Sequence, residues 1–428
     1  MRKGFLFWVG LGDLAALALA AMGASVFAYG TPLPWESVQH GGEVFPMLIF
    51  LVISMAVASS LTAQMSGPGV PRPTYGRMFA IALITGALTP TLILFTRTPY
   101  YSGSFLVITG GMWMILASLH RGVHRLRPWT EKIGIITGEK ELAEDLAASP
   151  NAVVVWVLDP KFDGPLELPD RDVNMAVDLR AVLSERVARF LSSCDVAGYK
   201  IRPFSSVYEE HTGRVPLVHL GEGWEISAPL LEVAPWLPGK RLFDLVITAA
   251  LSPIWVAVGL LVAGYIRLAT RGPALFRQPR VGHEGRSFTM YKFRTMDEDA
   301  EKDGPRFATE HDERLIKGGS FLRKSRLDEI PQLVNVLKGD MSLVGPRAEQ
   351  VPFVEEFQRY IPFYDHRHLV RPGITGWAQV NYGYADDEAD TIEKLTYDLF
   401  YIKHMSPVMD LRVLWKSVWT VLTGFGAR

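Results

Sequence analysis

The chain of 428 residues has a single cysteine, Cys194, so no intrachain disulfide can form. A chain without disulfides is typical of proteins whose soluble parts stay in a reducing cytoplasm. The net charge is only −1, with 44 basic and 45 acidic residues, so no global field attracts nucleic acid. A site that binds anions must therefore be a local cluster of basic residues.

Charge is scarce in the first 120 residues, where four apolar stretches occur. They cover residues 5–29, 44–62, 78–96 and 103–120. Each is close to the ~20 residues that a helix needs to cross a bilayer. A cleavable signal peptide is the alternative for the first stretch, but its apolar run is longer than signal peptides have. The pattern predicts a bundle of four membrane-spanning helices over residues 1–120.

Basic residues are unequally distributed between the two sides of this bundle. One side would carry Arg2, Lys3, Arg72, Arg77, Arg121, Arg125 and Arg127, and the other only Arg97. Loops rich in Lys and Arg stay in the cytoplasm, so both ends of the bundle are predicted to be cytoplasmic. Asp13 lies inside the first span, where a carboxyl group is costly. It is either a functional group or, more simply, a residue near the helix end that faces neighbouring helices.

The middle of the chain, residues 121–235, has the pattern of a small soluble α/β domain. Strands are expected at 133–136 and 152–158, with a helix at 139–148 between them. A working dinucleotide site needs the turn G-x-G-x-x-G/A after the first strand. Starting from Gly138, Lys140 replaces the second glycine and would block a pyrophosphate, although Ala143 is tolerable at the third position. A structural or regulatory domain is therefore favoured over a nucleotide site.

A fifth apolar run covers residues 242–266 and carries Ser252-Pro253 near its middle. Proline inside a helix costs ~3 kcal/mol unless the helix bends, and a nearby serine hydroxyl can satisfy the freed backbone groups. The flanking residues on both sides are basic: Lys240, Arg241, Arg267 and Arg271. Positive charge on both flanks favours a re-entrant helix, which enters and leaves on the cytoplasmic face, over a kinked span.

Six basic side chains in the C-terminal region accompany one acidic pair, Asp328-Glu329. The cations are Lys292, Arg294, Arg323, Lys324, Arg326 and Arg347. Clustered arginines suit bidentate phosphate binding. The acidic pair precedes a helix begun by Pro331, whose positive end favours an ionised carboxylate. Such a carboxylate can ligate Mg²⁺ or attack phosphorus.

Each of these features alone has a simpler explanation. An aspartate before a helix is usually an N-cap, and arginines near acids are usually surface ion pairs. Their concentration between residues 292 and 347, beside a membrane helix, predicts a phosphate site.

The motifs of this region are long and specific. They are FRQPRVG at 276–282, FTMYKFRTM at 288–296, LRKSRLDEIPQL at 322–333, KGDMSLVGPR at 338–347, RPGITGWAQV at 371–380 and YDLFYI at 397–402. With them, residues 240–428 resemble the bacterial sugar transferases, which are monotopic polyprenyl-phosphate phosphoglycosyl transferases. The whole layout is similar to the large members that initiate exopolysaccharide, capsule or O-antigen synthesis. It implies three domains: four spans (1–120), a degenerate Rossmann-like domain (121–235), and a mixed α/β catalytic domain on a re-entrant helix (236–428).

The resemblance implies a two-step reaction at the cytoplasmic face of the bacterial inner membrane. Asp328 would attack the β-phosphorus of a UDP-sugar, a hexose such as glucose or galactose, and expel UMP. Undecaprenyl phosphate would then attack the aspartyl phosphosugar and give undecaprenyl-diphospho-sugar. Glu329 would help in positioning or proton handling, and Mg²⁺ at Asp328 would offset the phosphate charge. Arg323 and Arg347 match phosphate-contacting positions, with Lys292 and Arg294 as further candidates.

Several other features leave alternatives open. Residues 408–424 form an apolar helical stripe of Leu411, Leu414, Trp415, Val418, Trp419 and Leu422, with Arg412 and Lys416 on another side. This helix could lie in the membrane interface or pack against the catalytic core. Trp377 could shape the nucleotide pocket, and Asp398 is either structural or a substrate contact. Asp365, His366 and His368 have poor metal-ligand spacing and are expected in a solvated turn.

Two rival functions follow from the same residues. An inactive membrane scaffold for glycan-assembly enzymes would show decay of the acidic pair or of the arginines, yet Asp328-Glu329 and Gly345-Pro346-Arg347 are intact. A redox or sensor protein built on the middle domain would need the glycine-rich turn that this chain lacks. The sequence leaves the oligomeric state open, including a homodimer.

Overall fold

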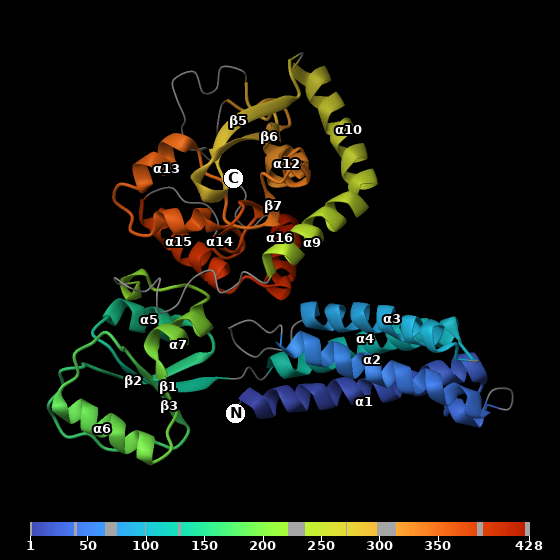
Figure 1. The fold of residues 1–428 in the computed structure, drawn as a ribbon, viewed down its shortest axis with the longest axis horizontal. Helices are drawn as coiled ribbons and strands as arrows, with labels where there is room; N and C mark the ends of the chain where they lie inside the picture. The colour runs from blue at the N-terminus through green and yellow to red at the C-terminus, as the bar shows by residue number, and fades with distance from the viewer. Residues whose placement is uncertain are drawn as a thin grey trace. The chain divides into compact units, whose positions relative to one another are not determined.

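The computed structural model describes residues 2–37, 41–64, 75–98, 100–126, 130–220, 236–270, 272–297, 314–382 and 388–423 (Figure 1). They form two compact units, Met1–Thr212 and Gly213–Arg428, each of which is described by itself. The first unit contains an apolar helical bundle and an α/β domain. The predicted boundary at 235/236 differs from the observed division, because Val215 and Leu220 pack in the core of the second unit.

The bundle consists of four long apolar helices: α1 (Arg2–Tyr29), α2 (Phe45–Gln64), α3 (Tyr75–Thr96) and α4 (Gly103–Leu126), with the short turns η1 (Pro34–Glu36) and η2 (Gly41–Val44). Neighbouring helices pack as α1 with α4, α2 with α3, and α3 with α4. Large apolar side chains remain exposed on the outside, including Leu83, Leu94 and Phe95. All four helices are long and apolar enough to cross a membrane. The predicted helical N-terminal region is therefore present.

Asp13 faces a neighbouring helix, as the simpler prediction had it. Its carboxylate accepts hydrogen bonds from both terminal nitrogens of Arg121, at 2.6 and 2.8 Å, and lies 3.0 Å from His120 Nε2. Arg121 was counted among the loop cations, which is wrong, because it lies in α4 and is fully buried. Arg77 likewise bonds within the bundle, to Thr62. Both arginines stabilise helix packing and carry less weight as loop charges.

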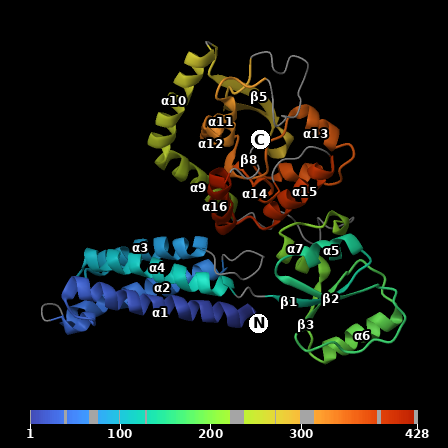
Figure 2. The ribbon, with the colours of Figure 1, turned by 180° about the vertical axis from the view of Figure 1, so that it is seen from behind.

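The α/β domain has four parallel strands in the order β2-β1-β3-β4: β1 (Glu131–Ile136), β2 (Ala152–Leu158), β3 (Val173–Val177) and β4 (Ile201–Pro203). Helices α5 (Lys140–Ala148) and α7 (Phe204–Thr212) cover one face, and α6 (Glu185–Val196) covers the other (Figure 2). The two predicted strands and the helix between them are confirmed. The order is that of flavodoxin-like domains rather than of dinucleotide-binding ones.

The second unit contains a long helix pair, a hairpin and a set of short elements. They are η3 (Leu217–His219), α9 (Trp236–Ala250), α10 (Ser252–Thr270), β5 (Leu275–Val281), η4 (His283–Gly285), β6 (Ser287–Phe293), α11 (Gly319–Lys324), η5 (Leu327–Glu329), α12 (Gln332–Lys338), β7 (Ser342–Val344), α13 (Val351–Phe357), η6 (Tyr364–Leu369), β8 (Gly373–Thr375), α14 (Trp377–Asn381), α15 (Glu388–Lys403) and α16 (Pro407–Thr423). Strands β5 and β6 pair antiparallel, and β7 and β8 pair parallel.

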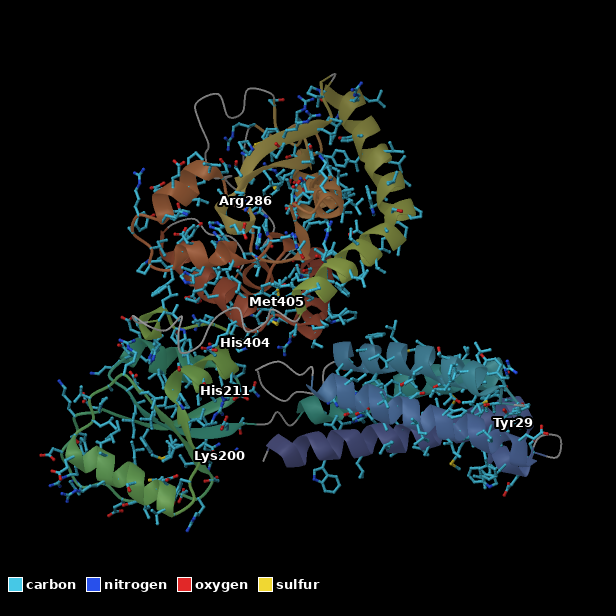
Figure 3. The ribbon with its side chains drawn as sticks, viewed as in Figure 1. Tyr29, Lys200, His211, Arg286, His404 and Met405 are labelled. Atoms are coloured by element: carbon cyan, nitrogen blue, oxygen red, sulfur yellow. The ribbon has the colours of Figure 1, made fainter. Side chains whose placement is uncertain are left out.

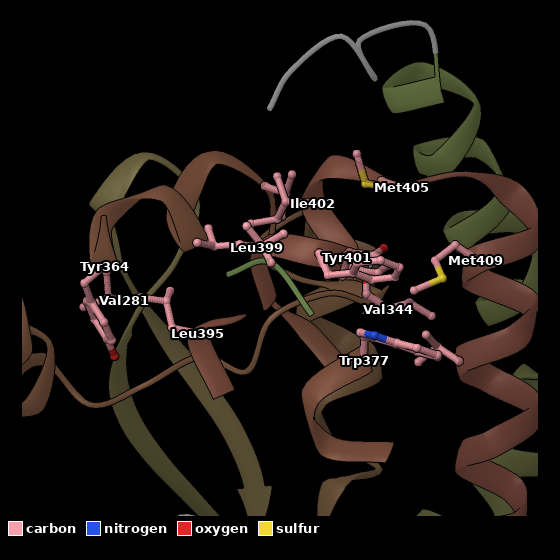
Figure 4. Close-up of a cluster of buried hydrophobic side chains, with 14 of the residues drawn as sticks. Val281, Val344, Tyr364, Trp377, Leu395, Leu399, Tyr401, Ile402, Met405 and Met409 are labelled. Carbon is pink, nitrogen blue, oxygen red and sulfur yellow. The ribbon is translucent and has the colours of Figure 1, made fainter. Parts of the chain in front are cut away.

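The core of this unit gathers around α15, whose apolar side chains meet β7, α14 and α16 (Figure 4). Tyr401 is 1% exposed, and its hydroxyl donates to Val344 O at 3.1 Å or to Asp410 Oδ1 at 2.6 Å. Each large apolar side chain buried here contributes about 1.5–3 kcal/mol. The strands β7 and β8 approach so closely that a Cβ on Gly373 would lie 2.1 Å from Gly345 N. Glycine is therefore required there, and this contact fixes the turn that leads to Arg347.

The fifth apolar run is two helices that meet at a bend beside Ser252-Pro253 (Figures 1 and 2). The indole Nε1 of Trp255 donates to Thr248 O at 2.9 Å, a carbonyl of the last turn of α9. A serine hydroxyl was expected in this role, but no hydrogen bond of the Ser252 side chain occurs within the described residues. The tryptophan thus satisfies a carbonyl at the break.

The two halves of this helix pair have different surroundings. In α9 one face is buried, with Lys240, Asp244 and Thr248 at successive turns. In α10 one face packs on the unit through Val262 and Ile266, whereas Leu260, Leu261 and Leu268 on the other side are 69–86% exposed (Figure 3). By length and composition, α10 is also long and apolar enough to cross a membrane without α9. Both helices therefore pack on the second unit, and α10 also presents an apolar surface.

Candidate active site

The acidic pair lies in η5, a short turn between α11 and α12. Arg326, which precedes the turn, has φ of 53°, a left-handed conformation that non-glycine residues adopt at some energetic cost. Asp328 is 7% and Glu329 8% exposed. Helix α12 begins after Pro331 without a side-chain cap, so neither carboxylate serves as its N-cap. The structure therefore does not support the simpler explanation, in which the acidic pair caps the helix that follows it.

Three cations surround Glu329. Lys292 Nζ and Arg347 Nη1 each lie 3.5 Å from its Oε1, and Arg326 Nη1 lies 3.5 Å from its Oε2. Burial by itself raises the pKa of Glu329, but Lys292, Arg347 and Arg326 together hold the pKa below its ordinary value. Glu329 is therefore an ionised carboxylate that fixes three cationic side chains in one place.

Asp328 makes no hydrogen bond or ion pair within the described part of the chain. Burial raises its pKa to about 6, and the neighbouring Glu329 adds to the increase, while Lys292, Arg323 and Arg347 oppose it. The expected effect of the helix end, which favours the ionised form, is opposed here by burial, the largest cause of the raised pKa. The carboxylate oxygens of Asp328 remain available to a ligand.

Four of the six predicted cations gather at the acidic pair, and two do not. Lys292, Arg323, Arg326 and Arg347 act on one or both carboxylates. Arg294 is buried, and the hydrogen bond described for it runs to Thr270 at the end of α10. The side chain of Lys324 is exposed. Strand β6 ends at Phe293, so Arg294 lies just beyond the strand that carries Lys292.

Asn335 connects the strand that carries Lys292 to the helix that follows the acidic pair. It is fully buried in α12, accepts a hydrogen bond from Tyr291 N at 3.0 Å and donates to Thr289 O at 2.8 Å. These two bonds hold β6 against α12 and so set the distance from Lys292 to Glu329. The sequence analysis missed Asn335, although an amide on the apolar face of a short helix was the available signal.

A second layer of charges supports the backbone of Arg347. Arg367 Nη2 donates to Arg347 O at 3.2 Å and to Asp398 Oδ2 at 2.8 Å, and its Nη1 donates to the Tyr364 hydroxyl at 2.5 Å. Burial raises the pKa of Asp398 to about 6, against the opposing effect of Arg367. The contacts described for Asp398 give it a structural role behind the site. The sequence analysis also missed Arg367, because its partners are distant in sequence.

Asp365, His366 and His368 of η6 were expected in a solvated turn; Asp365 is exposed and His366 partly exposed, but His368 is buried. His368 is 9% exposed, and burial, with the nearby Arg367, lowers its pKa to about 4. A neutral buried imidazole fits a role in packing against Tyr364. No group of three or more His, Cys, Asp or Glu side chains that could hold a metal occurs in the described residues.

Residues 236–424 match the family model described as bacterial sugar transferase. The chain belongs to this family. It is 44% identical over 243 residues to the UDP-N-acetylgalactosamine-undecaprenyl-phosphate N-acetylgalactosaminephosphotransferase of Aeromonas hydrophila, covering 56% of each chain. It is 39% identical over 183 residues to the UDP-glucose:undecaprenyl-phosphate glucose-1-phosphate transferase of Escherichia coli, which covers 42% of this chain and 39% of that one.

A shorter relative matches over most of its length. The uncharacterized sugar transferase EpsL of Bacillus subtilis is 40% identical over 191 residues, which is 44% of this chain and 89% of that protein. By contrast, the chain spans about half the length of the Aeromonas protein that it matches. The part matched by the family model, residues 236–424, lies in the unit that carries Asp328 and Glu329.

Proposed function

We propose that this protein transfers a sugar-1-phosphate from a UDP-sugar to undecaprenyl phosphate, giving undecaprenyl-diphospho-sugar and UMP. The observation that carries the proposal is the contrast within the acidic pair. Asp328 is buried without a hydrogen bond or ion pair in the described residues, whereas Glu329 holds three cations beside it. A free carboxylate next to clustered cations suits nucleophilic attack on a phosphate. The named relatives act on substrates of this class.

In the first step a carboxylate oxygen of Asp328 forms a bond to the β-phosphorus of the UDP-sugar. The bond from that phosphorus to the oxygen shared with the α-phosphate breaks, and UMP leaves with the electron pair. Lys292, Arg323 and Arg347 offset the charge that develops on the phosphate oxygens, because their interactions strengthen in a site that excludes water. The product is a phosphosugar ester of Asp328.

In the second step a phosphate oxygen of undecaprenyl phosphate attacks the same phosphorus and releases the Asp328 carboxylate. Glu329 acts by position rather than as a proton donor, because its neighbouring cations keep its pKa low and its carboxylate ionised. It holds Lys292, Arg326 and Arg347 around the phosphate in both steps.

The residues fit a bound Mg²⁺. Mg²⁺ is held by one or two carboxylates together with waters and substrate phosphates, so it does not require a cage of protein ligands. Asp328 offers oxygens that make no hydrogen bond or ion pair in the described residues. When bound there, the ion would supply charge neutralisation between the carboxylate and the phosphates.

We further propose that α9 and α10 form a re-entrant helix. Near the start of α9, Lys240 Nζ lies 2.8 Å from Asp410 Oδ2. Near the end of α10, Tyr265 donates to Lys317 O at 2.9 Å and Thr270 bonds to Arg294. Because both ends of the pair attach to one compact unit, a return to the same face is favoured over a crossing. Together with the loop charges, this supports a catalytic unit on the cytoplasmic face of the bacterial inner membrane.

The reaction is tested by incubating the purified protein with Mg²⁺ and one of UDP-glucose, UDP-galactose, UDP-N-acetylglucosamine or UDP-N-acetylgalactosamine. Without undecaprenyl phosphate we expect a burst of one UMP per active site and a protein mass increased by the phosphosugar. Adding undecaprenyl phosphate gives continued release. Asp328→Asn abolishes the burst and the mass increase, whereas Asp365→Asn, a change at an exposed carboxylate, leaves both intact.

If no UMP is released with any of these sugars, the result contradicts the proposed transferase activity and favours the inactive membrane scaffold. A hexose is the expected sugar, and UDP-N-acetylgalactosamine is included in the panel because the Aeromonas relative is named for it.

The helix topology is tested separately by labelling cysteines introduced at positions 236 and 270 with an impermeant reagent. Labelling from opposite sides of the membrane would contradict the re-entrant helix.

A further inference from the structure

Helix α16 is apolar on two opposite faces. Met409 and Val413 are at most 4% exposed and pack in the core of the catalytic unit. On the opposite face Leu411, Trp415 and Val418 are 41%, 50% and 57% exposed. A helix that packs one apolar face on a core and exposes a second apolar face beside basic side chains is suited to the surface of a membrane. Since one side of α16 packs on the core, the other is suited to the interfacial region of a bilayer.

Arg412 and Lys416 lie one turn apart on the flank between these two faces. Both are stacked on Trp377, with Arg412 Cζ 5.7 Å and Lys416 Nζ 4.7 Å from the ring centroid. Lys416 Nζ also donates to Asn381 Oδ1 at 2.6 Å. These contacts hold two positive groups in place rather than leaving them to rotate in solvent.

Neither cation has a carboxylate partner among the described residues. Other partly or fully buried cations of the same unit do: Lys240 pairs with Asp410, Arg367 with Asp398, and Arg347 with Glu329. Burial, together with the adjacent Arg412, lowers the pKa of Lys416 to about 8. Two like charges held side by side without a counter-ion make a site for an external anion.

We propose that Arg412 and Lys416 bind the phosphate of an anionic phospholipid headgroup. A guanidinium and an ammonium one turn apart can share the oxygens of one phosphate. The apolar face with Leu411 and Val418 would lie against the acyl chains of the same leaflet, and long basic side chains reach from such a face to the headgroup level. Free phosphate has the same charge but would gain nothing from the apolar face, so the lipid is the occupant favoured.

The position of this site gives it a connection to the strands behind the catalytic residues. Ser417 Oγ lies 2.6 Å from Thr375 Oγ1 on β8, and β8 pairs with β7, which leads to Arg347. A lipid held on α16 would therefore steady the same pair of strands that carries a cation of the active site.

The test is the retention of lipid by the full-length protein, extracted from bilayers of equimolar phosphatidylglycerol and phosphatidylcholine and examined by native mass spectrometry. We expect the double variant Arg412→Gln, Lys416→Gln to bind phosphatidylglycerol roughly ten- to thirtyfold more weakly, because each cation near an anionic surface contributes about a fivefold gain. Retention of phosphatidylcholine should not change. The matched control is Arg186→Gln, Arg189→Gln, which removes two charges from an exposed face of α6.

Two further measurements separate charge from folding and lipid from free phosphate. The charge-preserving pair Arg412→Lys, Lys416→Arg should restore retention, and a melting curve in neutral detergent reports whether the glutamine variant is folded. Wild-type protein without preference for phosphatidylglycerol would overturn the proposal even if that variant fails to fold. Displacement of the lipid by millimolar inorganic phosphate would assign the site to the free anion and also overturn it. None of these measurements depends on UMP release, so they stand apart from the proposed reaction.

Discussion

Replacing Asp328 by asparagine removes a charge that burial in the fold disfavours. The ordinary pKa of an aspartate is 3.8, and burial raises that of Asp328 to about 6. The ionised carboxylate is thus destabilised in the folded protein by roughly two pKa units, or about 3 kcal/mol. Asparagine has nearly the same shape and carries no charge, so the variant should be more stable than the wild type.

The stability gained by Asp328→Asn depends on pH, and the direction of this dependence follows from the raised pKa of Asp328. Between about pH 4 and pH 6 the folded state binds a proton at Asp328 that the unfolded state has already lost, so wild-type stability falls as pH rises. Above about pH 6 the full penalty is present, and below about pH 4 it vanishes because both states are protonated. The advantage of Asp328→Asn should therefore be largest at pH 8 and disappear at pH 4.

The measurement is the thermal unfolding midpoint of the full-length protein in detergent at pH 8 and at pH 4. For a unit of this size, about 3 kcal/mol corresponds to an increase of roughly 6–12 °C at pH 8. Asp365→Asn serves as the control and should show no such difference, because its side chain is exposed. An unchanged or lower midpoint for Asp328→Asn at pH 8, or a gain that persists at pH 4, would refute the reasoning.

Three further outcomes are expected from other contacts. UMP release should rise with pH through about 6 and then level off, because Asp328 attacks as a carboxylate and its pKa is raised to about 6; a flat profile from pH 5 to 8 would contradict this. Asp398→Asn should lower kcat at least tenfold with little change in KM for the UDP-sugar, since it loosens Arg367 rather than a substrate contact. Trp255→Phe should lower stability by about 1–2 kcal/mol, because Thr248 O loses its donor at the bend, and an unchanged melting midpoint would show that another group replaces it.

Much of the local structure was predictable from periodicity and motifs. The apolar stretches of the N-terminal region appear as helices, and strands β1 and β2 lie where their apolar runs predicted them. Ser252-Pro253 predicted the break in the fifth run, because proline is disfavoured in the interior of a helix. These features depend on residues close in the chain, whose spacing alone decides the outcome. The family motifs likewise named Asp328 and Glu329 as the acidic pair.

The ionisation of the charged side chains at the site, and the partners that they bind, depend on residues that are far apart in the chain. The sequence could not separate Lys292, which reaches Glu329, from Arg294, which bonds to Thr270, because the two are only two residues apart in one motif. Lys240 looked like a membrane flank, but its ammonium is buried against Asp410. Charge counts treat such residues as solvated, and only the fold reveals that they are paired internally.

The family, the acidic pair, the apolar helices and the position of the bend all follow from motifs and local spacing in the sequence. The tertiary structure alone decided that Glu329 takes the cations while Asp328 stays without a partner in the described residues. It also decided that α16 turns an apolar face outward. The physical reason is burial: the pKa and the partners of a charged group depend on what the fold packs around it, which neighbours in sequence do not specify.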